Sequence, residues 1–335
     1  MSETAVKLFK RSVFVQSLLA AAALAATGLP AHAQSGFPNK PVTIVTAFPA
    51  GSGPDSVIRA VSEKLSKIWM QPVLINNKPG GGGFIAIDAA IRAPADGYTL
   101  IQLDNEHLAA LPVLCKSKNF ITLNNFDLVA PIFKTPFLVA VPTDSKWKSM
   151  KDLVDAAKAS PGKVNYGSWG IGSPGHMGGE QLELLTGIEM THVAYREMSQ
   201  LFTSVGSGEL QWSFGSLPSS SGIFKAGKLR YLAVASPTRL PQMPDVPTVT
   251  ESGGPAGFEI SSYVALLAPK GLPKDIQAKI HADMMTALAD PDIKARFNTF
   301  VFEAINWSPE EMRRVSEAKM KVYAELAKRK NISLD

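Results

Sequence analysis

The stretch Pro41–Phe48 reads PVTIVTAF, an apolar run that predicts a buried strand. A loop of glycine, proline and serine at 49–54 follows it, and then the segment Asp55–Trp69. That segment carries one apolar stripe at helical spacing, formed by Val57, Val61, Leu65 and Ile68. A strand, a short loop and an amphipathic helix in this order predict the first unit of an α/β fold.

The same alternation of strand-like and helix-like segments continues along the chain, as is typical of parallel sheets joined by crossover helices. Further strands are predicted at 73–75, 98–103, 137–141, 164–166, 210–214, 229–235 and 263–267. Further helices are predicted at 150–159, 176–186, 200–207 and 275–289. A last helix is expected to begin at a capping box, with Ser308 as N-cap, Pro309 at the first helical position and Glu311 at N3, and to run to Arg329.

The chain after residue 33 is long enough for two medium-sized α/β domains. It shows no internal repeat and no long low-complexity linker, so a second domain would be reached by short crossings. The runs at 137–141 and 263–267, each ending at a proline step, are the candidates. We therefore expect residues 36–137 plus 265–335 to form lobe 1 and residues 138–264 to form lobe 2.

The first 33 residues have the layout of a signal peptide. A basic start is followed by an apolar run at 13–26 and by the small-residue step Ala31-His32-Ala33. A membrane-spanning helix would need about 20 unbroken apolar residues, whereas Gly28 and Pro30 close this run early. No cysteine follows the expected cleavage point after Ala33 until Cys115, so we expect a soluble, secreted protein rather than a lipoprotein.

Charge and cysteine content exclude several classes of protein. The formal net charge is +5, of which residues 1–33 contribute +2 (Lys7, Lys10 and Arg11 against Glu3), leaving +3 on the mature chain. Lysine and arginine are dispersed apart from the run at 328–330, so the charge does not predict nucleic-acid binding. Cys115 is the sole cysteine, so no intramolecular disulfide can form.

Glycine-rich loops are the main candidates for function. They lie at 49–55, 79–84 and 167–176, and the first and third each follow a predicted strand and open a helix. Glycine there lets several main-chain N–H groups converge near the positive end of a helix, where a carboxylate can bind without lysine or arginine. A single loop of this kind is most simply interpreted as a tight turn. The presence of two such loops, one in each expected lobe, favours anion binding. Neither has the Gly-Lys-Ser/Thr sequence of a nucleotide-phosphate loop.

Motifs for catalysis and metal binding are missing from the sequence. It has no Gly-x-Ser-x-Gly elbow and no His-Glu-x-x-His, and its mature histidines show no metal-ligand spacing. A triad assembled from residues distant in sequence stays open as an alternative. We predict a binding protein that has no cofactor and no metal and is not an enzyme.

A set of short motifs along the mature chain resembles the tripartite tricarboxylate transporter receptor family, also called Bug proteins. The motifs occur in the same order as in the family, at 37–41, 48–55, 76–83, 95–100, 160–163, 195–196, 226–230 and 244–249. The resemblance implies a type II periplasmic-binding-protein fold, in which two α/β lobes are joined by a two-strand hinge and a ligand lies in the cleft between them. It also implies a periplasmic location and a carboxylated solute held largely by main-chain groups and waters.

The resemblance also assigns binding residues by position. The first-lobe loop would be formed by Gly51, Ser52, Gly53 and Asp55. The opposing loop would be formed by Ser168, Gly170, Gly172, Ser173 and His176. The pair Tyr195-Arg196 matches the family's Tyr-Lys/Arg pair, with the alternative that Arg196 points outward and contacts only water.

Departures from the family pattern bear on the ligand. Where the family usually has Asp-Asn this chain has Gly215-Ser216, and aromatic rings stand at Trp169 and Phe84, where polar or small residues are usual. With Phe48 these rings favour a flat apolar ligand body beside the carboxylate site, unless all three are core or rim residues. An aromatic carboxylate such as terephthalate fits both features, and citrate-like or C4 dicarboxylates are the alternative.

The expected partners follow from the same resemblance. They are a small carboxylate and the membrane subunits of a tripartite transporter, and the protein is expected to be a monomer. Delivery to a signalling partner and an enzyme on the same fold remain as alternative interpretations.

Overall fold

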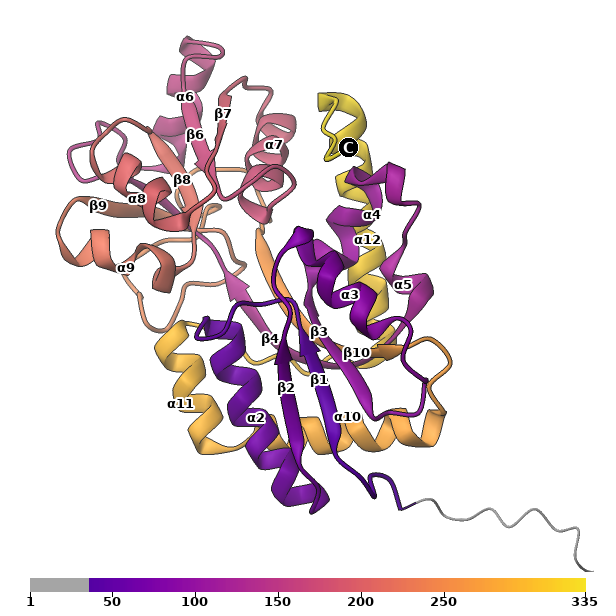
Figure 1. Ribbon diagram of the computed structural model, residues 1–335. Coiled ribbons are helices and arrows are strands. Elements are labelled where there is room, and N and C mark those ends of the chain that lie inside the picture. The colour runs from indigo at the N-terminus through magenta and orange to yellow at the C-terminus, as the bar shows by residue number, and fades with distance from the viewer. Residues whose placement is uncertain (1–35) are drawn as a thin grey trace, which may run out of the picture. The chain divides into compact units, whose positions relative to one another are not determined.

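The computed structural model describes residues 36–335 and contains two five-stranded sheets with eleven α-helices (Figure 1). The predicted signal peptide at 1–33 lies outside the described residues. We call the sheets A and B. Each mixes parallel and antiparallel strands, so the predicted α/β class is confirmed.

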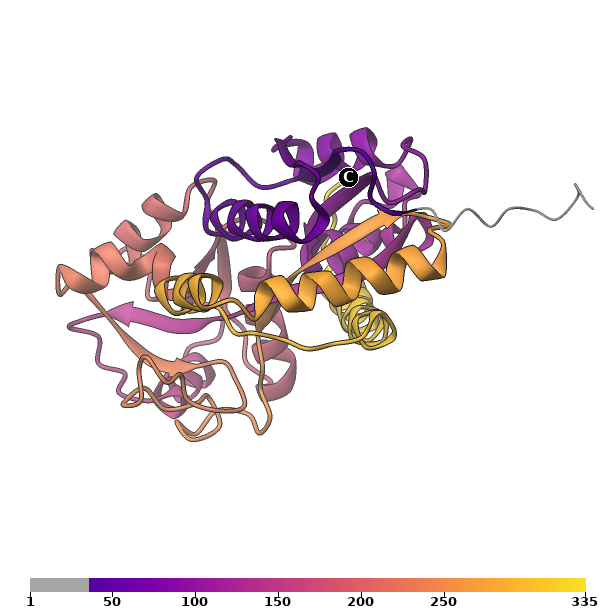
Figure 2. The same cartoon turned by 90° about the horizontal axis from the view of Figure 1, so that it is seen from below.

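Sheet A has the strand order β2-β1-β3-β10-β4. Its strands are β1 (Val42–Thr46), β2 (Val73–Asn77), β3 (Thr99–Asp104), β4 (Phe126–Pro136) and β10 (Ser261–Pro269). β1 runs parallel to β2 and β3, whereas β10 is antiparallel to β3 and β4. Its helices are α2 (Gly53–Trp69), α3 (Phe84–Ala90), α4 (Leu111–Leu114), α5 (Thr122–Asn125), α10 (Lys274–Leu288), α11 (Pro291–Phe300) and α12 (Pro309–Lys330). Figure 2 shows α2, α10 and α11 side by side.

Sheet B has the strand order β7-β6-β8-β5-β9. Its strands are β5 (Leu138–Pro142), β6 (Asn165–Ser168), β7 (Thr191–Ala194), β8 (Trp212–Gly215) and β9 (Leu229–Val234). β6 is parallel to β7 and β8, and β5 is antiparallel to β8 and β9. Its helices are α6 (Met150–Ala159), α7 (Pro174–Thr186), α8 (Met198–Gly206) and α9 (Leu217–Lys225).

The chain passes between the sheets twice, once at a single residue and once through the longer segment 235–260. β4 of sheet A ends at Pro136, β5 of sheet B begins at Leu138, and only Phe137 lies between them. The chain leaves sheet B after Val234 and enters sheet A again at Ser261. The buried side chain of Phe137 is part of the sheet B core, so the passage itself is packed and apolar.

Every predicted strand is present, but β4 and β7 were not predicted, nor were the helices α3, α4, α5, α9 and α11. β4 contains Pro131 and Pro136, which argue against a strand interior, and its pairing with β10 shifts register next to Pro131. The last helix begins as expected, because Ser308 Oγ accepts a hydrogen bond from the Glu311 N–H at 3.1 Å. The second half of the predicted box is wrong: the Glu311 carboxylate pairs with Arg314 instead. A complete capping box stands at α6, between Ser149 and Asp152.

Each sheet has its own core, and a third cluster joins the two parts of the chain. Trp212, Tyr166 and Phe214 fill the interior around sheet B. The third cluster places Met177 of α7 among residues of α4, of α12 and of the turn Glu106–Ala110, namely Ala109, Ala110, Leu114, Tyr323, Leu326 and Ala327. The start of α7 is thereby packed against elements that belong to sheet A.

Candidate functional site

The first loop leads from β1 into α2. Gly51 has φ +81°, a conformation that glycine adopts without strain. Ser52 is the N-cap of α2, and its Oγ accepts a hydrogen bond from the Asp55 N–H at 3.4 Å. Pro54 fills an early helical position, where its missing N–H costs nothing.

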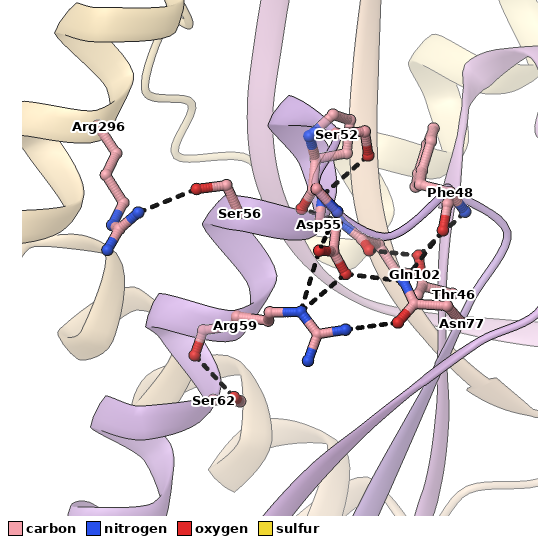
Figure 3. A network of polar contacts seen from close by, with 12 residues as sticks. Thr46, Phe48, Ser52, Asp55, Ser56, Arg59, Ser62, Asn77, Gln102 and Arg296 are labelled. Carbon is pink, nitrogen blue, oxygen red and sulfur yellow. Dashed lines mark hydrogen bonds and ion pairs between the residues drawn. The ribbon is translucent and has the colours of Figure 1, made fainter.

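Asp55 is the centre of a polar network in this loop (Figure 3). Its side chain is 2% exposed and accepts hydrogen bonds from the Gly51 N–H at 2.8 Å, from Arg59 Nε at 2.9 Å and from Asn77 Nδ2 at 2.7 Å. Burial alone would raise the pKa of this carboxyl, but the hydrogen bonds from Arg59, Asn77 and Gly51 outweigh it and lower the pKa. Asp55 therefore organises the loop, and Ser52 rather than Asp55 caps the helix.

The second loop leads from β6 into α7 and repeats this construction. Gly172 has φ +79°, and its N–H donates to His176 Nδ1 at 3.1 Å. Ser173 is the N-cap, and its Oγ accepts a hydrogen bond from the His176 N–H at 3.4 Å. In both loops the N–H of the N-cap serine donates to a carbonyl three residues earlier at 3.2 Å, that of Pro49 or Gly170. The shared pattern is Gly-Ser-x-x-Asp in one loop and Gly-Ser-x-x-His in the other.

This five-residue repetition is visible in the sequence but was not predicted, because repeat architectures have much longer periods. In GSGPD and GSPGH the residue four positions after the glycine supplies the acceptor that holds the glycine N–H. Asp55 and His176 were predicted as binding residues, but the structure gives each a local structural task.

Some loop N–H groups point to a binding role because the loops do not use them. Within residues 36–335 no acceptor takes a hydrogen bond from the N–H of Ala50 or Gly53 in the first loop. The same is true of Ile171 and Gly175 in the second. These donors stand at the N-termini of α2 and α7, where the helix dipole favours an anion.

Behind the second loop lies a stacked histidine pair, in which His176 is buried and His192 is half-buried. The rings of His176 and His192 stack with centroids 3.9 Å apart, and His192 Nε2 is 2.7 Å from Ser168 Oγ. Burial and the neighbouring His176 lower the pKa of His192 to about 4. Glu180 Oε1 lies 3.5 Å from His176 Nε2 and accepts a hydrogen bond from the Tyr166 hydroxyl at 3.1 Å. His192 and Glu180 were not predicted, because only folding brings them next to the loop.

The three aromatic candidates have different surroundings. Trp169 is half-buried, lies 5.2 Å from Phe137 between ring centroids, and packs on the first turn of α7. A Cβ on Gly175 would stand 2.6 Å from this indole, so glycine is needed there. Phe84 is half-buried, lies 5.9 Å from Phe120 between ring centroids, and packs against the edge of the sheet A core. Phe48 is half-buried with its ring at an edge-on angle to His107, 6.4 Å away.

The remaining predicted residues lie on other elements of sheet B. Tyr195 directly follows β7, and its N–H donates to the Ser168 carbonyl at 2.8 Å, which ties it to the second loop. It also lines a pocket on α8 with Ser199, Gln200, Thr203 and Ser204. Arg196 is exposed, and among the described residues it has no ion pair. Ser216 is the N-cap residue of α9, and its Oγ donates to Ser219 Oγ at 2.9 Å.

A metal site, a membrane-spanning helix and a reactive thiol are the other functional features to consider in residues 36–335. Between Gly36 and Asp335 no group of three His, Cys, Asp or Glu side chains could hold a metal ion. Over the same span no helix combines the length and apolar composition that a membrane crossing requires. Cys115 is a free, half-buried thiol, and burial raises its pKa.

Comparison with known families gives one extended match. The family described as "Tripartite tricarboxylate transporter family receptor" matches residues 57–332. A curated relative, the UPF0065 protein in the tcbD-tcbE intergenic region of Pseudomonas sp. (strain P51), is 31% identical over 295 residues, which is 88% of each chain.

Solved structures agree with this match. The chain is similar to Rpa4515 of R. palustris, solved with adipate, with a TM-score of 0.75 and 29% identity over 89% of this chain and 99% of that one. It is also similar to the periplasmic binding protein BugD, with a TM-score of 0.71 and 26% identity over 89% of this chain and 99% of that one. The predicted periplasmic-binding-protein fold is thereby confirmed.

Proposed function

The chain belongs to the tripartite tricarboxylate transporter receptor family, and on that premise we propose that it captures a small carboxylate between the loops at 49–55 and 168–176. Members of this family are periplasmic solute-binding receptors that bind small carboxylates and work with the membrane components of a tripartite transporter. The observation that carries the proposal is the repeated loop, which leaves main-chain N–H groups unused at two helix N-termini.

The second loop is proposed to take the carboxylate. At the start of α2 the ionised Asp55 already occupies the positive end of the helix, so this loop is expected to hold a carboxylate more weakly, although Arg59 partly offsets the charge. At the start of α7 the corresponding residue is His176, which accepts a main-chain N–H at Nδ1. An acceptor nitrogen carries no proton, so this tautomer adds no negative charge near Ile171 and Gly175. The first loop would then contact the far end of the ligand.

An aromatic carboxylate such as terephthalate is the proposed ligand class, and Trp169 is the residue that supports it. Phe84 and Phe48 support it less, because the ring of Phe84 packs against Phe120 and that of Phe48 lies edge-on to His107. Trp169 is half-buried beside the N–H groups of the second loop, where its ring could pack against a flat ligand at about 0.5–1.5 kcal/mol beyond area burial. A few charge-assisted hydrogen bonds of roughly 1.5–3 kcal/mol each would allow micromolar binding after ordering costs.

An aliphatic dicarboxylate is the second candidate, because the similar protein Rpa4515 was solved with adipate. Calorimetry with terephthalate, benzoate, adipate, succinate and citrate separates the two. The aromatic proposal expects terephthalate or benzoate to bind most tightly and Trp169→Ala to weaken that binding about three- to tenfold. Tight binding of an aliphatic acid alone, with no response to either aromatic acid, would establish the second candidate instead.

We also propose that two lobes close on the ligand without changing it. Sheet A and its helices would form lobe 1, and residues 138–260 would form lobe 2. We place the end of lobe 2 before Ser261 rather than at 264, because β10 pairs within sheet A from Ser261 onward. The protein is proposed to be a monomer after cleavage following Ala33, and not to be an enzyme. Mass spectrometry of the secreted protein tests the cleavage, and recovery of unaltered ligand after long incubation tests the absence of turnover.

A further inference from the structure

The C-terminal helix reaches α7 through an ion cluster. Lys330, the last residue of α12, pairs with Glu183 Oε2, and its Nζ lies 3.4 Å from Glu180 Oε2. Both acidic residues belong to α7, on the sheet B side of the fold, whereas α12 packs on sheet A elements. Next to this cluster, Met177 packs among Leu326, Ala327 and Leu114. The contact is therefore both apolar and ionic.

The carboxylates of Glu180 and Glu183 are deeply buried, so their stability depends on the positive charge of Lys330. The side chains of Glu180 and Glu183 are 9% and 3% exposed. Among the described residues, Glu180 Oε2 has no hydrogen bond, so the ammonium of Lys330 is its nearest counter-charge. Burial raises the pKa of Glu183 in spite of its bond to Lys330. Removing the cation would leave buried carboxylates uncompensated, which is costly.

From this cluster a short chain of contacts leads to the second loop. Glu180 pairs with His176, and His176 Nδ1 holds the N–H of Gly172. The loop also touches the C-terminal tail directly. A Cβ on Gly172 would stand 2.4 Å from Leu114 and 3.5 Å from Leu334, and the Leu334 N–H donates to the Leu114 carbonyl at 2.9 Å.

We propose that Lys330 is a positioning residue for carboxylate binding: by holding Glu180 and Glu183 it docks α7 on α12 and fixes the loop at 170–176. It does not itself touch the ligand. The inference rests on the proposed function for its effect on binding, but its effect on the loop is independent of any ligand. The equivalent position of the first loop has no such link, because Asp55 is held within its own neighbourhood by Arg59 and Asn77.

The test is hydrogen exchange of the full mature chain without ligand, followed by calorimetry with adipate and terephthalate. Lys330→Met is the first variant. Since it leaves Glu183 unpaired, Lys330→Met with Glu183→Gln provides a second variant without that buried charge. Lys330→Arg keeps the pairing, and Lys328→Met, on the exposed side of the same helix end, is the matched control.

We expect the peptide covering 168–177 to exchange at least tenfold faster in the double variant while the peptide covering 49–56 is unchanged. Lys330→Arg should restore the wild-type rate, and the Kd of the acid that binds should rise about five- to thirtyfold in the double variant. Wild-type exchange at 168–177 in a folded Lys330 variant, or equal acceleration in Lys328→Met, would overturn the inference. If neither acid binds the wild-type protein, the proposed function fails while the exchange result still decides the role of Lys330.

Discussion

The two loops that open α2 and α7 are built alike but held differently. In each loop a glycine with positive φ precedes the serine that caps the helix. The N–H of that glycine donates a hydrogen bond to the side chain four residues later. In the first loop the acceptor is an ionised carboxylate that also binds Arg59 and Asn77. In the second it is an imidazole, stacked on His192 and linked through Glu180 to α12. One loop is stabilised locally by charge, and the other by contacts with distant parts of the chain.

This difference assigns separate tasks to the two loops. The first loop has its own counter-ion and also contacts Gln102 and Phe302, but among the described residues it makes no hydrogen bond or ion pair with α12. A loop that depends on α12 and on the C-terminal tail keeps its shape only while those contacts are made. If the second loop binds the carboxylate as proposed, its affinity is expected to depend on these contacts with α12 and the C-terminal segment.

The largest expected difference between the loops comes from changing the matched glycines to alanine. Both have positive φ, which costs alanine about 1–2 kcal/mol. At Gly51 the new Cβ meets open space, whereas at Gly172 it would stand 2.4 Å from Leu114. We expect Gly172→Ala to lose about 2–4 kcal/mol of stability and most carboxylate binding, and Gly51→Ala only about 1–2 kcal/mol. Urea unfolding of both variants checks this, and equal losses would contradict it.

Asp55→Asn should have a smaller effect that stays within the first loop. The amide can replace the shape of the carboxylate but not its charge toward Arg59, and an N–H group then faces the donors of Gly51 or Asn77. A loss of about 1–3 kcal/mol is expected. Ser56→Ala is the control, since Ser56 only accepts an exposed hydrogen bond from Arg296. Hydrogen exchange at 168–177 should stay at the wild-type rate, and its acceleration would show that the loops are not independent.

Mild acid should affect the second loop before the first. The pKa of His192 is about 4 in the folded protein against an ordinary 6.5, so the unfolded chain takes up a proton that the folded one refuses. Stability is therefore lost as the pH falls from 6.5 toward 4, by on the order of 1–3 kcal/mol. His176, Glu180 and Tyr166 surround this ring. The pKa of Asp55 is lowered below 3.8, so its contribution persists above that pH and is lost only below it.

Unfolding at pH 7 and pH 5 in the wild type and in His192→Gln tests this order. The variant should be less stable than the wild type at pH 7, because it loses the stacking on His176 and the bond to Ser168. Its free energy of unfolding should fall less than that of the wild type between pH 7 and pH 5. An identical loss in both proteins would contradict the assignment to His192.

The smallest effect is expected at Arg196, although it is a cation that directly follows Tyr195, whose N–H donates to the Ser168 carbonyl at the start of the second loop. It is exposed and has no ion pair among the described residues. If main-chain N–H groups bind the carboxylate, Arg196→Ala should change the Kd less than threefold in calorimetry. Loss of binding in this variant would show that the Arg196 guanidinium, rather than the main chain, binds the carboxylate.

The sequence predicted eight of the ten strands and six of the eleven helices of residues 36–335, because the apolar periodicity of those elements is local. Pro41–Phe48 and Asp55–Trp69 needed nothing from the rest of the chain to be assigned. β4 could not be predicted, because a buried strand with two prolines has no alternation to detect. The network behind the second loop was also out of reach, since His192, Glu180 and Lys330 come from different elements and meet only after folding.

Unused main-chain N–H groups at the start of α7 are proposed to bind the carboxylate. The most direct measurement is a titration of the ¹⁵N-labelled mature protein with terephthalate and, separately, adipate, following the amide signals by NMR. We predict that the amides of Ile171 and Gly175 shift most and that those of Ala50 and Gly53 shift less. If binding is evident elsewhere but the amides of Ile171 and Gly175 do not move, the claim is contradicted.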